Sequence, residues 1–182
     1  GFKTVYVSKE IPELCFKSVK FTGDEDFTPI HRLLEVASQQ QGTSILLDAD
    51  LRIGERIGMV GHRIYGDLKM ITSRRWTIMR DGKGEGVAGV FPNDFAVDFY
   101  MGDPSLFSEP ARLIPKGCRV AHNLWDSWLV GYFNKTLGDK FRSATKYKFL
   151  YHPMHKERAC PFGDDHFVED EYSKYAGHPR EL

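Results

Sequence analysis

The sequence predicts an α/β fold in which helices cover both faces of a largely parallel central sheet, giving three layers. Two observations support this prediction. Short runs rich in β-branched and aromatic residues alternate with segments whose apolar residues recur at helical spacing. This β-α-β-α order is also the pattern from which helix-covered parallel sheets are built. At 182 residues the chain has the size of one domain with a proper core.

Each predicted element rests on its local pattern. Thr28 followed by Pro29 is a favourable helix start, because Thr caps free backbone N–H groups and Pro suits the first helical position. The helices are predicted at 28–40, 53–65 and 123–134, with a short helical turn at 11–14. The strands are predicted at 3–8, 16–22, 44–47, 68–72, 76–79, 95–100 and 147–151, and a flexible loop at 81–86.

The composition excludes some classes of function. Lys and Arg together number 25, as do Asp and Glu, so the formal net charge is zero. This balance argues against bulk electrostatic binding of nucleic acid or of an anionic membrane. No apolar run approaches the length of a membrane span, and no signal-peptide pattern opens the chain. Cys15, Cys118 and Cys160 lack metal-like spacing and are expected to be free thiols, which favours the cytoplasm.

The first candidate site follows the strand predicted at 44–47. Asp48 and Asp50 stand directly after this apolar strand, at the edge where α/β sheets bind ligands. A hard cation such as Mg²⁺ or Mn²⁺ takes carboxylate oxygens and completes its coordination with water and substrate phosphates. Acidic residues are also common where helices begin, because they favour the helix dipole, so a structural role is the alternative.

The second candidate is Asp126, in the helix predicted at 123–134. Trp125 and Trp128 flank it with large aromatic surfaces, as the wall of a sugar-binding site would. A carboxylate in that position can accept a proton from an attacking hydroxyl. In the structural alternative, Asp126 bonds back to Asn123, the predicted N-cap three residues before it.

The third candidate is the pair His152 and His155, which follows the strand predicted at 147–151. Only Pro and Met separate the two, so a turn can direct one imidazole back toward the strand ends. Imidazole is a ligand for Mn²⁺ and also forms hydrogen bonds with phosphate.

Together these motifs resemble those of nucleotide-sugar glycosyltransferases of the GT-A fold, and more narrowly those of an uncharacterised transferase-like group. That group combines a strand ending in Asn/Asp-x-Asp, a later Asp-[Leu/Phe]-Phe segment, a Trp-Asp-x-Trp-Leu helix and a closing His-x-x-His. The matching segments are Asp48-Ala49-Asp50, Asn93-Asp94-Phe95, Trp125-Asp126-Ser127-Trp128-Leu129 and His152-Pro153-Met154-His155. The resemblance implies a Rossmann-like GT-A type domain over residues 1–158, and it leaves a polar C-terminal tail at 159–182.

The resemblance implies transfer of a sugar from a nucleotide-diphosphate donor to a hydroxyl acceptor. Mn²⁺ or Mg²⁺ would neutralise the charge of the departing diphosphate. Asp126 would contact the acceptor, and would act as the base if the reaction inverts configuration. The implied metal ligands are Asp48 and Asp50 with His152 or His155, and the implied donor-binding residues are Arg74, Arg75, Asp94 and Trp125. For the arginines the alternative is a solvated surface position, and for Asp94 an ordinary place at the start of a strand.

The chain departs from the group in one respect. It opens directly before what resembles the group's second strand, so the strand and loop that cradle the nucleotide base are missing. Another chain or domain would supply that strand, or the chain is a fragment, or the nucleotide pocket is incomplete. The main alternative is therefore a degenerate transferase domain that acts as a binding or scaffolding module in a larger assembly. An aspartate-nucleophile phosphohydrolase ranks third, because Leu51-Arg52 follows Asp50 and no fitting lysine motif is apparent.

Overall fold

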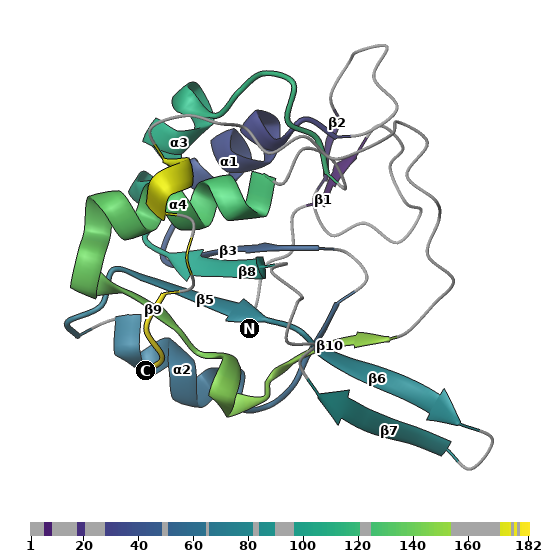
Figure 1. The fold of residues 1–182 in the computed structure, drawn as a ribbon. Coiled ribbons are helices and arrows are strands. Elements are labelled where there is room, and N and C mark those ends of the chain that lie inside the picture. Colours follow the sequence, from purple (N-terminus) through teal and green to yellow (C-terminus); the bar gives the residue numbers. More distant parts are fainter. Residues whose placement is uncertain are drawn as a thin grey trace.

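The structure is a computed structural model (Figure 1). It describes residues 6–8, 18–20, 28–48, 51–64, 66–81, 84–89, 97–120, 125–153, 172–175, 177 and 179–182. Within these ranges the chain forms a mixed α/β fold whose strands are divided among three small sheets.

The main sheet has four strands in the order β3-β8-β5-β9. β8 runs antiparallel to both of its neighbours, whereas β5 and β9 are parallel. It follows that β3, β5 and β9 share one direction and end at the same edge of the sheet, where β8 begins. These strands are β3 Ser44–Leu47, β5 Met70–Arg74, β8 Val97–Gly102 and β9 Phe141–Ser143.

A second sheet has the order β4-β10-β6-β7, and β1 and β2 form a small parallel pair. Only Arg75 separates β5 from β6, so the chain passes from the main sheet into the second sheet at that residue. The β6–β7 hairpin then projects away from the main sheet (Figure 1). The strands are β1 Tyr6–Ser8, β2 Ser18–Lys20, β4 Arg52–Ile53, β6 Trp76–Asp81, β7 Gly84–Gly89 and β10 Leu150–Pro153.

Helices lie on both faces of the main sheet (Figure 1). Because strand side chains alternate, Met70 faces the core under α1, α3 and α4, whereas Ile71 faces the core under α2. The helices are α1 Ile30–Ser38, α2 Ile57–Ile64, α3 Ser108–Leu113 and α4 Trp125–Leu137. The 3-10 turns are η1 Pro104–Phe107, η2 Gly138–Lys140, η3 Thr145–Tyr147 and η4 Ser173–Tyr175. No helix in the described part of the chain is long and apolar enough to cross a membrane.

The predicted three-layer, Rossmann-like GT-A type domain with a mostly parallel sheet is wrong. Among the described residues, four of the seven strand pairs are antiparallel and only three are parallel. The strands β3 and β5 follow one another in the predicted order but do not pair, because the later strand β8 lies between them and runs in the opposite direction. Local patterns show that a strand exists; they do not show its partner or its direction.

Several predicted boundaries also change. The segment 81–86, predicted as a flexible loop, contributes Asp81 and Gly84 to the paired β6–β7 hairpin. The helix predicted at 53–65 begins only at Ile57, because Arg52 and Ile53 pair with β10. Pro29 is the extended N-cap residue of α1, which makes no side-chain capping bond. The elements η1, α3 and β9 were not predicted, and the turn predicted at 11–14 lies outside the described residues.

The described C-terminal residues pack against the main sheet and α4. Residues 179–182 run beside β9, where the Ser143 N–H donates to the Arg180 carbonyl and the Leu182 N–H donates to the Ser143 carbonyl, both at 2.8 Å. The Tyr172 ring meets Trp128 of α4 edge-on, with centroids 5.0 Å apart. The predicted division into a domain at 1–158 and a tail at 159–182 stays a prediction.

Candidate functional site

The candidate site lies where β3, β5 and β9 end, called here the strand-end edge and defined by Asp48, Arg74, Arg75, Val97 and Asp126. In open parallel sheets ligands bind beyond the carboxyl ends of the strands, and β3, β5 and β9 share one direction here although β8 between them is antiparallel. Asp48 directly follows β3, Arg74 ends β5, and Val97 begins β8. The three elements are therefore brought to one edge by the pairing of the sheet.

Asp126 is fixed to this edge by two hydrogen bonds. Its Oδ2 atom accepts from the Val97 N–H at 3.1 Å, and its carbonyl accepts from the Tyr100 hydroxyl at 2.7 Å. Val97 is only 1% exposed, and a buried N–H needs an acceptor within the protein. The carboxylate therefore ties the first turn of α4 to the start of β8, a role the sequence interpretation did not include. The predicted capping residue Asn123 lies outside the described residues.

Asp48 follows β3 at the same edge of the sheet. The side chains of β3 alternate, so Leu46 packs in the core beneath α4 and Leu47 packs on the opposite face. Asp48 is the first residue after the strand, and the same alternation continued by one residue would direct it to the face of Leu46. Leu46 pairs with Tyr100, whose hydroxyl reaches Asp126, and Asp48 lies two residues, about 7 Å, farther along the strand.

A change of register marks the same place. Between Ser73 and Arg74 the pairing of β5 with β8 skips one residue, so that Arg74 lies opposite Val97. Such bulges are frequent beside active sites, where they redirect side chains. The Arg74 N–H donates to the Thr145 hydroxyl oxygen at 3.0 Å, which joins the end of β5 to the turn after β9. Arg74 and Arg75 are both half-buried, and they stand where β5 ends, at the same edge of the sheet as Asp48 and Asp126.

His152 lies on β10, the neighbour of β4 and β6 in the second sheet. It pairs with Thr77 of β6, and the adjoining Tyr151 pairs with Arg52 of β4. The chain needs only three residues to pass from Asp48 to β4, and the Leu51 N–H donates to the Asp48 carbonyl at 3.3 Å within this turn. The strand that carries His152 therefore lies beside the segment that follows Asp48.

The other predicted site residues are placed differently or not at all. Trp125 is 6% exposed and Trp128 is 2% exposed, and both belong to the core cluster under α4. Their rings are core surfaces, and an exposed aromatic wall is not what the structure shows. The predicted residues Asp50, Asp94 and His155 lie outside the described residues. In the described ranges, no group of three or more His, Cys, Asp or Glu residues is arranged to hold a metal ion.

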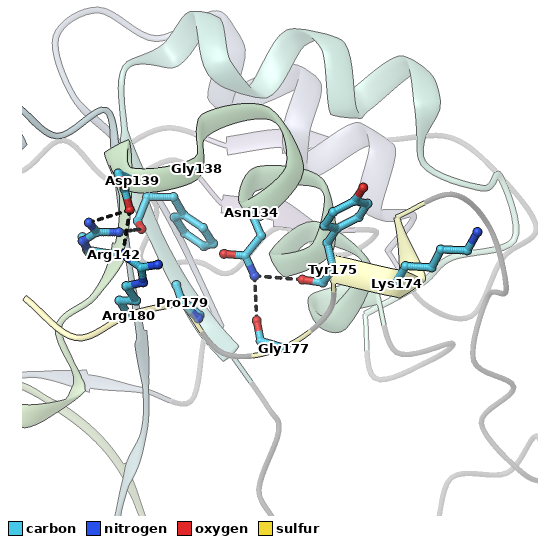
Figure 2. A pocket seen from close by; sticks show the side chains of 10 residues that line it. Asn134, Gly138, Asp139, Arg142, Lys174, Tyr175, Gly177, Pro179 and Arg180 are labelled. Atoms are coloured by element: carbon cyan, nitrogen blue, oxygen red, sulfur yellow. Dashed lines mark hydrogen bonds and ion pairs between the residues drawn. The ribbon is translucent and has the colours of Figure 1, made fainter.

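A cavity lies at the other end of the sheet (Figure 2). It measures about 490 Å³ and is bounded by the end of α4, the start of β9 and the C-terminal residues. Asn134, which lines it, is eight residues after Asp126, about 12 Å along α4, so this cavity is separate from the strand-end edge.

Four polar side chains of this cavity are bonded to other parts of the protein: Asn134, Asp139, Arg142 and Arg180. The Asn134 amide donates to the Tyr175 and Gly177 carbonyls at 2.8 and 2.6 Å. The Asp139 carboxylate pairs with Arg142 and Arg180, and the Arg142 hydrogen bond holds the pKa of Asp139 below its usual range. Figure 2 shows both sets of bonds joining α4 and η2 to neighbouring segments. We assign them a structural role.

A second cavity of about 440 Å³ lies where β6 and β10 leave the junction of the two sheets. The sequence interpretation missed it, although Trp76 and Tyr151 near two predicted strand ends were a usable signal. The residues that line it are Gly54, Glu55, Arg56, Trp76, Lys148 and Tyr151.

Comparison with protein-family models found no match, and comparisons with curated proteins and with solved structures found none of significance. The resemblance to glycosyltransferases stays a prediction.

Proposed function

We propose that the chain transfers a sugar from a nucleoside diphosphate donor to a hydroxyl acceptor at the strand-end edge. The observation that supports the proposal is that the elements carrying Asp48, Asp126 and the Arg74-Arg75 pair, far apart in sequence, reach one edge of the main sheet. Sugar transfer needs stabilisation of a negatively charged leaving group and a base for the attacking hydroxyl. Carboxylates and guanidinium groups together supply both functions.

The transfer would depend on Mn²⁺ or Mg²⁺. The described donors fit such an ion in type, since Asp48 offers carboxylate oxygen and His152 an imidazole from the neighbouring strand segment. Asp50 and His155, outside the described residues, would complete the set. When bound, the ion would neutralise the charge that develops on the departing diphosphate.

The chain's own residues would orient the reactants and move one proton. Arg74 and Arg75 would hold the diphosphate oxygens, because guanidinium groups match phosphate geometry. The acceptor hydroxyl would attack the anomeric carbon as the bond to the diphosphate breaks, and its proton would pass to Asp126. The Val97 N–H fixes one oxygen of that carboxylate, which sets the orientation of the base.

A second candidate is a binding module without catalysis. It is favoured by the bond from the Val97 N–H to Asp126, which gives that carboxylate a purely structural use. In this case the strand-end edge would bind no nucleoside diphosphate, and no transfer would occur.

Thermal unfolding with a panel of nucleoside diphosphates, each with and without Mn²⁺, separates the two candidates. A ligand at 100 times its Kd stabilises the folded state by about 2.7 kcal/mol. For a chain of this length that corresponds to a rise in Tm of roughly 5–10 °C. We expect a Mn²⁺-dependent rise with one nucleotide, and no rise with any nucleotide would favour the module.

Two variants test where the nucleotide binds. Asp48→Asn should abolish the Mn²⁺-dependent part of the rise in Tm while the unliganded Tm stays close to the wild-type value. Asp67→Asn is the matched control, because Asp67 is exposed and precedes β5 at the opposite edge of the sheet. An Asp48→Asn variant that binds metal and nucleotide normally would show that the aspartate is structural.

A further inference from the structure

The second cavity has an aromatic wall that is held in place by hydrogen bonds. Trp76 lies opposite Tyr151 in the parallel pair of β6 with β10, so both side chains leave the same face of the sheet. The Trp76 indole N–H donates to the Thr145 carbonyl at 2.9 Å, and the Tyr151 hydroxyl donates to the Lys148 carbonyl at 2.5 Å. Both rings are half-buried, so part of each remains accessible to a ligand.

The turn from β4 to α2 forms the opposite wall. The Gly54 N–H donates to the Phe149 carbonyl at 2.6 Å, which holds this turn against β10. A Cβ atom at Gly54 would lie 3.1 Å from the Tyr151 ring, so a glycine permits the close approach. Glu55 and Arg56 follow on the same turn and are exposed at the cavity. This wall therefore combines a close approach at Gly54 with two exposed charged residues.

Lys148 places a cation directly over the aromatic wall. Its ammonium group lies 4.4 Å from the centre of the Trp76 ring. Its backbone has φ 51° and ψ 54°, and it is the one non-glycine residue with positive φ in the described part of the chain. Such strained conformations persist where the surrounding structure fixes them and are concentrated at functional sites. With Arg56 and Glu55, the lining residues carry one net positive charge.

We propose that this cavity binds a phosphate ester carried on a ring. The ring packs against Tyr151 and the uncovered part of Trp76, and the phosphate pairs with Lys148 and Arg56. A cavity of about 440 Å³ is within the range of small-molecule sites. An uncharged ring would form no ion pair with Lys148 or Arg56, and inorganic phosphate would not pack against the aromatic wall. None of these residues is assigned to the proposed sugar transfer, so this inference stands independently of it.

Tryptophan fluorescence tests the proposal, because Trp125 and Trp128 are buried and Trp76 is the accessible indole. The probes are adenosine and uridine monophosphate, glucose 6-phosphate, adenosine and inorganic phosphate. All titrations contain EDTA, so that failure of the metal-dependent transfer does not affect them. We expect saturable quenching by at least one phosphorylated ring, with adenosine and inorganic phosphate at least tenfold weaker. If the nucleotides bind more tightly than glucose 6-phosphate, the ring of the natural ligand is a base. If glucose 6-phosphate binds more tightly, that ring is a sugar.

The variants isolate the two halves of the site. Lys148→Gly removes the ammonium group and suits the left-handed backbone, so folding is preserved and binding should weaken at least tenfold. Arg56→Gln, at an exposed position, should also weaken binding, whereas Lys140→Ala, an exposed lysine at the other end of the sheet, should not. Trp76→Phe should remove the fluorescence response. No quenching by any phosphorylated ring, equal affinity for inorganic phosphate, or unchanged binding by Lys148→Gly would each overturn the proposal.

Discussion

Substitution of Asp126 separates a structural role from a catalytic role of the same carboxylate. Asp126→Ala removes the acceptor of the Val97 N–H, and because Val97 is buried, water does not replace that acceptor. Asp126→Asn keeps a carbonyl oxygen in nearly the same place but removes the charge and the basicity. The two variants therefore differ in whether the start of β8 keeps its bond to α4.

The expected loss of stability follows from the two interactions of the carboxylate. A hydrogen bond to a charged group contributes about 1.5–3 kcal/mol. A negative charge in the first turn of a helix contributes about 0.3–1 kcal/mol through the helix dipole. We expect Asp126→Ala to lower the free energy of unfolding by roughly 2–4 kcal/mol, and Asp126→Asn by about 1 kcal/mol.

Urea unfolding followed by circular dichroism measures these differences, with linear extrapolation to water. The control is Asp67→Ala, an exposed substitution that should stay within about 0.5 kcal/mol of wild type. If Asp126 is also the base, Asp126→Asn should reduce the transfer rate by roughly 10²–10⁴ although it remains folded.

Three results would refute this reasoning. An Asp126→Ala variant as stable as wild type would show that the bond to Val97 does not hold α4 to β8. Equal destabilisation by Asn and Ala would show that the acceptor oxygen is not the important feature. Full transfer activity of Asp126→Asn with any working donor would remove the catalytic assignment and leave the structural one.

Three further predictions concern the scaffold. Gly102→Ala should lower the free energy of unfolding by roughly 1–3 kcal/mol, because the added Cβ would lie 2.8 Å from a backbone oxygen. Gly61→Ala in α2, where nothing lies within 4 Å of the added Cβ, should raise it by about 0.5–1 kcal/mol. Thermal unfolding measures both variants, and equal effects would contradict the prediction. Burial, and then a hydrogen bond to a carboxylate of α3, raises the pKa of Tyr132 above its ordinary 10.0. The stability that the protonated hydroxyl contributes is complete below pH 10.0 and is lost as the pH rises, so the free energy of unfolding should fall more steeply above pH 10.0 in wild type than in Tyr132→Phe. Equal slopes for the two proteins would contradict this prediction. Glu181→Ala removes an acceptor 2.6 Å from the Ser143 hydroxyl and should speed hydrogen exchange at the Ser143 amide roughly threefold to tenfold. Glu181→Gln keeps an acceptor oxygen and should leave the exchange rate unchanged. An unchanged rate in Glu181→Ala would show that Glu181 does not hold residues 179–182 against β9.

Local sequence patterns predicted elements better than they predicted the arrangement of those elements. The strand predicted at 44–47 is confirmed as β3, because four consecutive apolar or small residues bounded by turns are a local signal. The position of β8 was predicted within two residues at each end, but its insertion between β3 and β5 was not. That insertion depends on pairs such as Leu46 with Tyr100, which are more than fifty residues apart. No periodicity in either segment indicates such a pair.

The candidate site shows the same limit. The sequence drew attention to Asp126, but its bond to Val97 joins residues 29 positions apart and has no local pattern. Trp125 and Trp128 were assigned to a sugar-binding wall because a local pattern does not distinguish an exposed aromatic surface from a buried one. In α4, Trp125 and every residue from Ser127 to Phe133 are buried, so this helix lacks the polar stripe that would have shown which face is covered.

The C-terminal residues beside β9 also affect how the folded chain behaves toward other chains. An outer strand with unpaired N–H and C=O groups can pair with the strand of a second molecule. In β9, the outer backbone groups of the last residue are already paired, because Ser143 donates to the Arg180 carbonyl and accepts from the Leu182 N–H. Detachment of residues 179–182 would uncover this strand and create a site at which aggregation can begin. Resistance to self-association on heating therefore depends on how firmly residues 179–182 remain attached to β9.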